Sequence, residues 1–225
     1  MVLGPLVRDF VPLLGGTAIA SLSPLVDQAF ASMVGDGAVV TLSYGNRLTG
    51  IVMGIGTTSV GLIALPHFSD LAAKSAWREM STLLRRLSLA TFALAIPAAA
   101  CIFIFSDPLI RVVFQRGQFS GGDTAAVAPV QAFYALQIPF HLAGIVGARA
   151  LNALRKNRAI IGIVVVNAIA NLLGDYFFMQ LLGVRGIALS TSFVHVVSCA
   201  GVYLCAGAEI RRLTRVASFG SRATA

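Results

Sequence analysis

Charged side chains are scarce in this sequence, and acidic ones are scarcer than basic ones. Asp, Glu, Lys and Arg make up only 12% of the 225 residues, whereas soluble domains carry about 25%. Hydrophobic residues make up 57%, and the mean hydropathy is +0.84. Apolar runs long enough to cross a bilayer recur along the chain. These features exclude an ordinary soluble domain and predict an all-α, polytopic membrane protein.

Residues for metal, disulfide or catalytic chemistry are also few. The three cysteines, Cys101, Cys199 and Cys205, lie within apolar runs and form no CxxC pair or cluster with histidine. We therefore expect packing cysteines, no metal site and no cofactor. The sequence also lacks a recognisable set of nucleophile, base and orienting residue, paired carboxylates or a phosphate-binding loop. The prediction is a protein that is not an enzyme.

The net charge is nevertheless +8, and a basic surface is the usual footprint of a nucleic-acid-binding protein. Here the Lys and Arg residues fall in short clusters between the apolar runs, which is the pattern that orients membrane helices. We therefore expect membrane lipids as the surroundings and no nucleic-acid partner.

Six apolar runs predict a bundle of six transmembrane helices. The predicted spans are residues 10–34, 39–68, 87–105, 124–151, 159–182 and 187–208. Together they form one predicted domain over residues 1–208. A basic cytoplasmic tail over residues 209–225 is expected to follow.

The distribution of Lys and Arg predicts the orientation. When the two termini and the loops after the second and fourth spans lie on one side, that side holds 13 of the 17 basic residues. The positive-inside rule then puts both termini in the cytoplasm.

Two connectors are expected to have structure of their own. Residues 76–87 carry apolar side chains at helical spacing, which predicts an amphipathic helix lying on the cytoplasmic membrane surface. The outer connector begins Ser-Asp-Pro at residues 106–108, which is typical of a helix start, and this helix is expected to end near Gly117. Residues 120–123 are expected to cap the fourth span.

Arg47, with Asn46 beside it, lies within the second span. A cation inside a spanning helix costs about 3 kcal/mol on insertion scales, so it usually faces a partner or a cavity. We predict that Arg47 contacts an anionic substrate or pairs with an acid such as Asp27. The alternative is that it reaches the outer membrane surface, because it lies near the start of the span.

Other polar residues within the spans are candidates for a cavity. Asn167 and Asn171 are four residues apart, with Asp175 four further on, so they share one helix face that must avoid lipid. His141 is a further candidate, although a lone histidine in a span is more often a packing residue. Asp27 fits either a hydrogen bond to a neighbouring helix or an ion or proton site.

Several motifs resemble those of one transporter family in order and spacing. They include VDQAFASMVGDGAVVTLSYGNRL, Phe-x-Arg-Gly-x-Phe at residues 114–119 with Asp123-Thr124 after it, and LGVRGIALSTS from residue 182. These motifs resemble the MurJ (MviN) family, part of the multidrug, oligosaccharidyl-lipid and polysaccharide (MOP) exporter superfamily. The resemblance covers nearly the whole chain.

The resemblance implies a lipid II flippase. Such a protein moves the undecaprenyl-pyrophosphate-linked peptidoglycan precursor across the bacterial inner membrane by alternating access. Two six-helix lobes face each other around a cationic cavity, and this chain resembles the C-terminal lobe. Arg47 matches a cavity arginine of the family and Asp27 matches an acid of the preceding helix. The expected substrate-binding residues are therefore Arg47, Asp27 and Asn46, with Asn167, Asn171 and His141 lining the cavity.

The sequence also departs from the family pattern. Gly50 stands where an acid is common, and Ile51-Val52 replace a usual proline. The first lobe and two further helices are missing, so we expect a second lobe from a longer chain, a partner protein or a second copy. The alternative functions are another MOP-superfamily exporter, of polyprenyl-linked polysaccharide or drugs, and a truncated membrane remnant that transports nothing.

Overall fold

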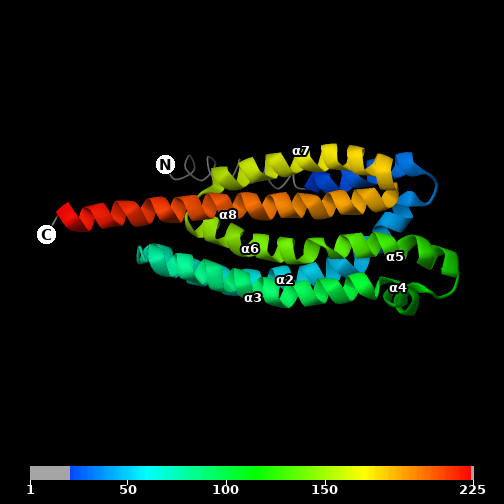
Figure 1. Cartoon of the computed structure of the whole chain (residues 1–225), viewed down its shortest axis with the longest axis horizontal. Helices are drawn as coiled ribbons and strands as arrows, with labels where there is room; N and C mark the ends of the chain where they lie inside the picture. The colour runs from blue at the N-terminus through cyan, green and yellow to red at the C-terminus, as the bar shows by residue number, and fades with distance from the viewer. Residues whose placement is uncertain (1–20, 224–225) are drawn as a thin grey trace, which may run out of the picture.

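The structure is a computed structural model, and it describes residues 21–223 (Figure 1). All regular elements in this part of the chain are helices, as predicted. A helix over residues 21–34 comes first. It is followed by α2 (Ala38–Ala73), α3 (Trp77–Ile104), α4 (Ser106–Phe114), α5 (Gly121–Ala135), α6 (Gln137–Ala153), α7 (Asn157–Leu182) and α8 (Val184–Ala223).

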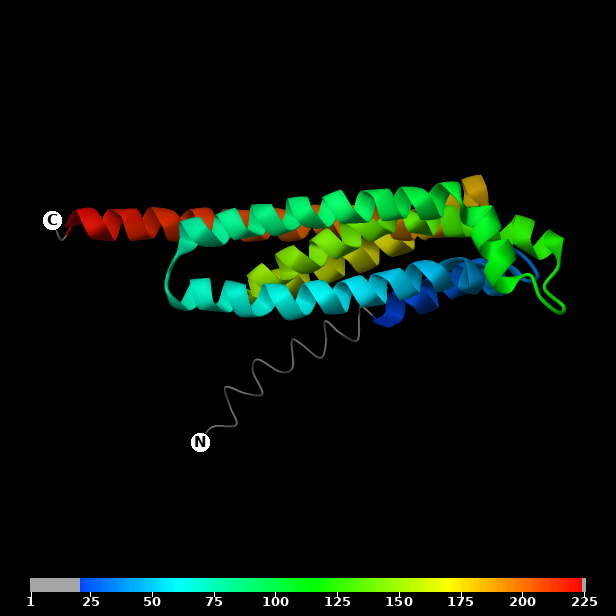
Figure 2. The same cartoon turned by 90° about the horizontal axis from the view of Figure 1, so that it is seen from below.

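The long helices lie side by side along one axis, which gives an elongated bundle (Figures 1 and 2). The element α6 lies in the middle and packs against α2, α3 and α8, while α7 packs mainly against α8. Between the described residues, α2 and α7 make no contact. The bundle is therefore open between these two helices.

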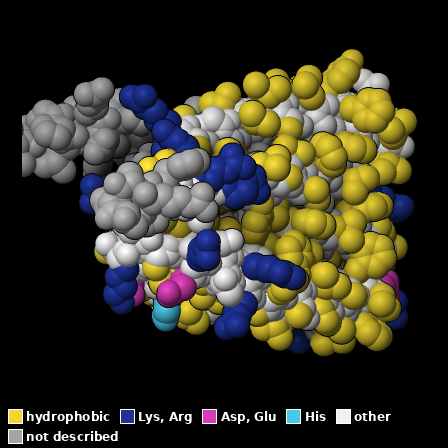
Figure 3. Space-filling model, turned by 60° about the vertical axis from the view of Figure 1, so that its left-hand side comes forward, with side chains coloured by type: hydrophobic (Ala, Val, Ile, Leu, Met, Phe, Trp, Pro, Cys, Tyr) yellow, Lys and Arg dark blue, Asp and Glu magenta, His cyan; other side chains and the backbone are white. Residues whose placement is uncertain are grey.

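Five helical segments of the described chain are long and apolar enough to cross a membrane. They are Ala38–Ala73, Trp77–Ile104, Gly121–Ala153, Asn157–Leu182 and Val184–Ser218. The helix over residues 21–34 is the described part of the predicted first span, whose residues 10–20 lie outside the described range. The arrangement is compatible with six spans. Hydrophobic side chains cover most of the visible face, with Lys and Arg gathered towards one end (Figure 3).

The predicted fourth span is divided at Leu136, where α5 ends and α6 begins. Pro139 explains the break, because it has no N–H to donate to the carbonyl of Ala135 and its ring crowds that carbonyl. Leu136 itself keeps helical angles (φ −62°, ψ −24°), so the two halves continue in nearly the same direction.

Two helices are longer than predicted. The segment 76–87 is not a separate surface helix, because α3 runs without interruption from Trp77 to Ile104. Nothing in the sequence breaks the helix there, and Met80 and Leu84 are buried in the same apolar cluster as Phe68. Residues 209–223 of the predicted tail likewise continue α8, which projects beyond the bundle in Figure 2.

The connector after α3 has the predicted helix, and its aromatic residues hold it in place. Its helix α4 ends at Phe114, and Ser120 and Asp123 then form a capping box at the start of α5, with Ser120 N–H donating to Asp123 Oδ2 at 2.7 Å. Phe114 and Phe119 both pack on Tyr44 of α2, with ring centroids 5.2 and 5.4 Å apart. The Phe-x-Arg-Gly-x-Phe motif thus fixes the connector to α2.

Candidate functional site

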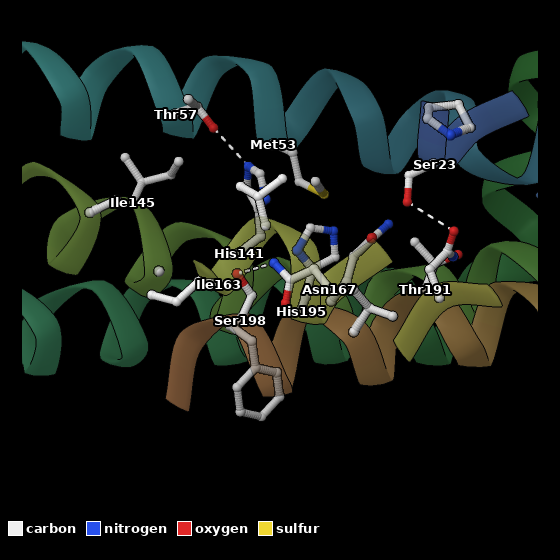
Figure 4. A pocket seen from close by; sticks show the side chains of 18 of the residues that line it. Ser23, Met53, Thr57, His141, Ile145, Ile163, Asn167, Thr191, His195 and Ser198 are labelled. Carbon is white, nitrogen blue, oxygen red and sulfur yellow. Dashed lines mark hydrogen bonds between the residues drawn. The ribbon is translucent and has the colours of Figure 1, made fainter. Parts of the chain in front are cut away.

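A cavity of about 790 Å³ opens between α2 and α7, where the two helices do not touch. Its floor is made by α6 and α8, and the helix over residues 21–34 closes one end (Figure 4). Five of the six predicted site residues line it, namely Asp27, Asn46, His141, Asn167 and Asn171. The structure therefore brings these predicted residues together from four separate helices.

Arg47 is the exception, because it is exposed and does not line the cavity. No ion pair or hydrogen bond joins Arg47 to another described residue. The alternative prediction, an ion pair between Arg47 and Asp27, is therefore not seen in the structure. On α2, Arg47 precedes the cavity-lining Gly54 by seven residues, which puts both on one helix face. Arg47 thus lies on the helix face that lines the cavity further along α2, and its side chain is exposed.

Asp27 binds neighbours on α7 and α8 instead. Asn171 Nδ2 donates to Asp27 Oδ1 at 2.9 Å, and Thr191 Oγ1 lies 3.1 Å from Asp27 Oδ2. Asn171 Nδ2 also lies 3.4 Å from Asp175 Oδ2, and Ser23 Oγ donates to Asn171 Oδ1 at 2.9 Å. Asp27, Asn171 and Asp175 are 8%, 2% and 0% exposed. We call Asp27, Asn171, Asp175 and Thr191 the oxygen cluster.

The oxygen cluster has ligand atoms that suit a hard cation. It brings two carboxyl groups and a hydroxyl together, and such oxygen ligands favour Na⁺, Ca²⁺ or Mg²⁺ over softer metals. Asn171 turns its amide nitrogen to both carboxyls and its oxygen to Ser23. Asp175 Oδ1 is buried and has no hydrogen-bond partner in the described chain. None of the ion pairs between described residues reaches either carboxyl. An unneutralised buried carboxylate is costly, so this arrangement favours a bound cation or proton.

Further along the cavity, polar contacts join the helices in pairs. Thr57 Oγ1 of α2 and His141 Nε2 of α6 are 2.9 Å apart, and Asn167 Nδ2 of α7 donates to Ser198 Oγ of α8 at 2.9 Å (Figure 4). His141 also stacks edge-on against His195, with ring centroids 4.9 Å apart. These contacts hold the floor of the cavity in one arrangement.

Sequence reasoning missed the part of α8 in this site. Thr191, His195 and Ser198 all line the cavity. Their spacing of four and three residues is the signal that could have found them, because it puts three polar side chains on one face of an apolar helix.

A second arginine, Arg149, lies near the other end of the cavity-lining stretch of α2 from Arg47. Arg149 follows the cavity-lining Ile145 by one helical turn, and Gly61 follows Thr57 by one turn on α2. Arg149 Nη2 lies 2.9 Å from the point where a Cβ of residue 61 would be, so a larger residue there would require the flexible end of Arg149 to move. Its Nε is buried without a hydrogen-bond partner in the described chain. Arg47 and Arg149 thus lie near the two ends of the stretch of α2 that lines the cavity.

Comparisons with known proteins agree with this architecture. A family model described as lipid II flippase MurJ matches residues 2–217. The chain belongs to the MurJ family. This is a family of flippases, which are transporters and not a class of enzymes. The predicted family is confirmed.

Relatives of known name cover most of this chain but are much longer. The probable lipid II flippase MurJ of Synechocystis is 30% identical over 169 residues, which are 75% of this chain and 32% of that protein. Lipid II flippase MurJ of Burkholderia cenocepacia is 29% identical over 82% of this chain and 36% of its own length. The chain therefore spans about a third of the length of these MurJ proteins.

Solved structures support the predicted fold of one lobe of a MOP-type transporter. A lipid II flippase MurJ in an inward closed conformation matches with a TM-score of 0.78 and 20% identity, over 88% of this chain and 42% of that one. A MOP-superfamily transporter from Pyrococcus furiosus matches with a TM-score of 0.70 and 18% identity, over 88% of this chain and 43% of its own. The fold corresponds to less than half of each transporter.

Proposed function

We propose that this chain is one lobe of a MurJ-type flippase, which moves a lipid-linked peptidoglycan precursor across the bacterial cytoplasmic membrane by alternating access. The observation that carries the proposal is the polar cavity between α2 and α7, which is open on one side. One lobe cannot present two faces that rock against each other. A second lobe, from a longer chain, a partner protein or a second copy, would cover this open side.

Arg47 and Arg149 would bind the diphosphate of the substrate. Guanidinium groups bind phosphate oxygens through paired, charge-assisted hydrogen bonds. Arg149 lies beside Gly61 of α2. The rise along α2 from Arg47 to Gly61 is about 21 Å. In the orientation with both termini in the cytoplasm, Arg149 lies at the cytoplasmic mouth and Arg47 in the outer half. A diphosphate entering from the cytoplasm would meet Arg149 first and Arg47 later.

The oxygen cluster would hold the coupling cation. Its ligands come from the helix over residues 21–34, α7 and α8. A cation would draw these three elements together, and its loss would leave two carboxyls in mutual repulsion. Cation binding at the cluster is therefore suited to shifting the lobe between two arrangements.

Complementation of a flippase-depleted strain tests the proposal, with the missing lobe supplied on the same plasmid. Arg47→Ala is expected to abolish growth rescue, whereas Arg111→Ala is expected to rescue fully. Arg111 is a matched control because it is exposed and paired with Asp107 at 3.1 Å, far from the cavity. Full rescue by Arg47→Ala, at normal expression, would remove this arginine from the mechanism.

The main rival is another MOP-superfamily exporter, of a different polyprenyl-linked glycan or a cationic drug. Asp27 and Asp175 are the observation in its favour, because acids attract cationic drugs. Both are buried and bonded to neighbouring side chains, however, and are therefore poorly placed to meet a bulky drug. Drug-resistance assays on cells that carry both lobes separate the two functions, since only the rival predicts increased resistance.

A further inference from the structure

The start of α3 and the end of α8 form a second, separate site. A groove of about 380 Å³ lies between them, lined by Arg78 and Ser81 of α3 and by Ile210, Arg211, Thr214 and Arg215 of α8. The spacing of three or four residues on each helix puts these side chains on facing surfaces. Three guanidinium groups and two hydroxyl groups therefore meet in one groove, and no acidic residue lines it.

The three arginines of the groove are free to bind a ligand. Among the described residues, no ion pair or hydrogen bond includes the guanidinium of Arg78, Arg211 or Arg215, although the carbonyls of Arg78 and Arg215 accept hydroxyl hydrogen bonds. Neighbouring basic residues differ in this respect. Lys74 donates to Asp70 at 2.7 Å, and this hydrogen bond raises the pKa of the Lys74 ammonium. Glu209 pairs with both Lys156 and Arg212, at 2.9 and 3.6 Å.

The groove lies where a lipid headgroup would be. The apolar cluster that includes Phe68, Met80 and Ile210 is directly beside it. Trp77, at the start of α3, is a residue type that favours the headgroup level. Arg211 turns back towards Gly207, with Nη1 3.6 Å from the point where a Cβ would be, so its guanidinium points along α8 towards the membrane-crossing part. Basic and hydrophobic surfaces adjoin at this end in Figure 3.

We propose that Arg78, Arg211 and Arg215 form a binding site for the phosphate of an anionic membrane lipid. The exposed hydroxyl of Ser81 supplies a further donor to phosphate oxygens, and the lipid's acyl chains stay in the surrounding membrane. Basic pockets between helices at the cytoplasmic surface are the usual sites for such headgroups. The site rests on the proposed orientation but not on flippase activity.

The test is lipid retention by the purified full chain, measured by native mass spectrometry after extraction from vesicles of equal phosphatidylcholine and phosphatidylglycerol. The expected result is preferential retention of phosphatidylglycerol. Each arginine near an anionic surface contributes about fivefold to binding. Arg211→Gln is therefore expected to lower retention about fivefold, and the triple variant R78Q/R211Q/R215Q to remove the preference.

Two matched controls distinguish lipid binding in this groove from a general effect of positive charge. Arg212→Gln removes the same charge one residue away, from a side chain already paired with Glu209, and is expected to retain the lipid. The triple variant R111Q/R116Q/R212Q has the same net charge as the site variant and is expected to keep the preference. Equal losses in the two triple variants would overturn the proposal. Circular dichroism checks that each variant keeps its helices.

Competition with inorganic phosphate distinguishes a lipid site from a site for soluble anions. Millimolar phosphate is expected to leave phosphatidylglycerol bound, because the acyl chains add apolar contacts that free phosphate lacks. Full displacement by phosphate would mean a site for soluble anions and would overturn the assignment to a lipid. Loss of growth rescue by Arg47→Ala has no bearing on this result, so the two proposals fail separately.

Discussion

The two walls of the cavity have different chemistry. The α2 wall carries no acid where it lines the cavity, and Arg47 of α2 and Arg149 of α6 lie near the two ends of this stretch. The opposite wall, made by α7, holds Asn171 and Asp175, and Asn171 binds Asp27 of the first described helix. One wall is suited to an anion and the other to a cation. A transporter that couples the two can thus keep substrate and ion on separate helices of one lobe.

The largest expected effect comes from separating α7 and α8. A Cβ on Gly186 would lie 1.9 Å from the carbonyl oxygen of Phe178, and backbone atoms cannot move aside as side chains do. Gly186→Ala is therefore expected to destabilise the protein by about 3 kcal/mol or more. Thermal unfolding in detergent measures the change. Gly162→Ala is the control, since that site is open and alanine favours a helix. Equal melting temperatures would mean that the hairpin is not tightly packed.

Cation binding at the oxygen cluster is tested by Asp175→Asn. The change keeps the shape of the side chain but removes one negative charge, so cation affinity is expected to fall about 100-fold. Isothermal titration of the two-lobe transporter with Na⁺, Ca²⁺ and Mg²⁺ measures it. Asp36→Asn, in the exposed loop before α2, is the control. Unchanged cation binding in Asp175→Asn would mean that the oxygen cluster only joins helices.

The end of the cavity near Gly61 is tested by Arg149→Ala. Loss of a hydrogen bond to a charged group costs about 1.5 kcal/mol or more, so binding of a lipid-linked diphosphate is expected to weaken about tenfold. Arg158→Ala removes an exposed arginine at the start of α7 and is expected to change little. Equal affinities for the two variants would leave Arg149 with a packing role only.

The smallest effect is expected where the α2 wall meets the floor. Thr57→Val keeps the volume but removes the hydrogen bond between α2 and His141. The expected loss of stability is about 1 kcal/mol. Chemical unfolding in detergent measures it, with Thr58→Val as a control, because Thr58 bonds only to the carbonyl of Gly54 on its own helix. A larger loss for Thr58→Val would contradict the link to α6.

Much of the fold and most of the site were predictable, because polar residues stand out in apolar helices. Asn167, Asn171 and Asp175 share a face by their spacing alone. Their assembly with Asp27 and Thr191 was not predictable, since it depends on packing between helices that are far apart in the sequence. The exposure of Arg47 has the same cause, whereas the interruption at Leu136 follows from a local feature, Pro139. Local patterns predict which face of a helix is polar, but tertiary packing decides which faces meet.

The most direct test of the two-wall account measures both ligands in the same two variants. Diphosphate and cation affinities of the two-lobe transporter are compared for Arg47→Ala and Asp175→Asn. The account predicts that Arg47→Ala weakens diphosphate binding about tenfold or more and leaves cation affinity unchanged. For Asp175→Asn, cation affinity is expected to fall, and diphosphate affinity measured at saturating cation is expected to stay unchanged. Equal losses of both ligands in both variants would contradict the separation of the anion and cation walls.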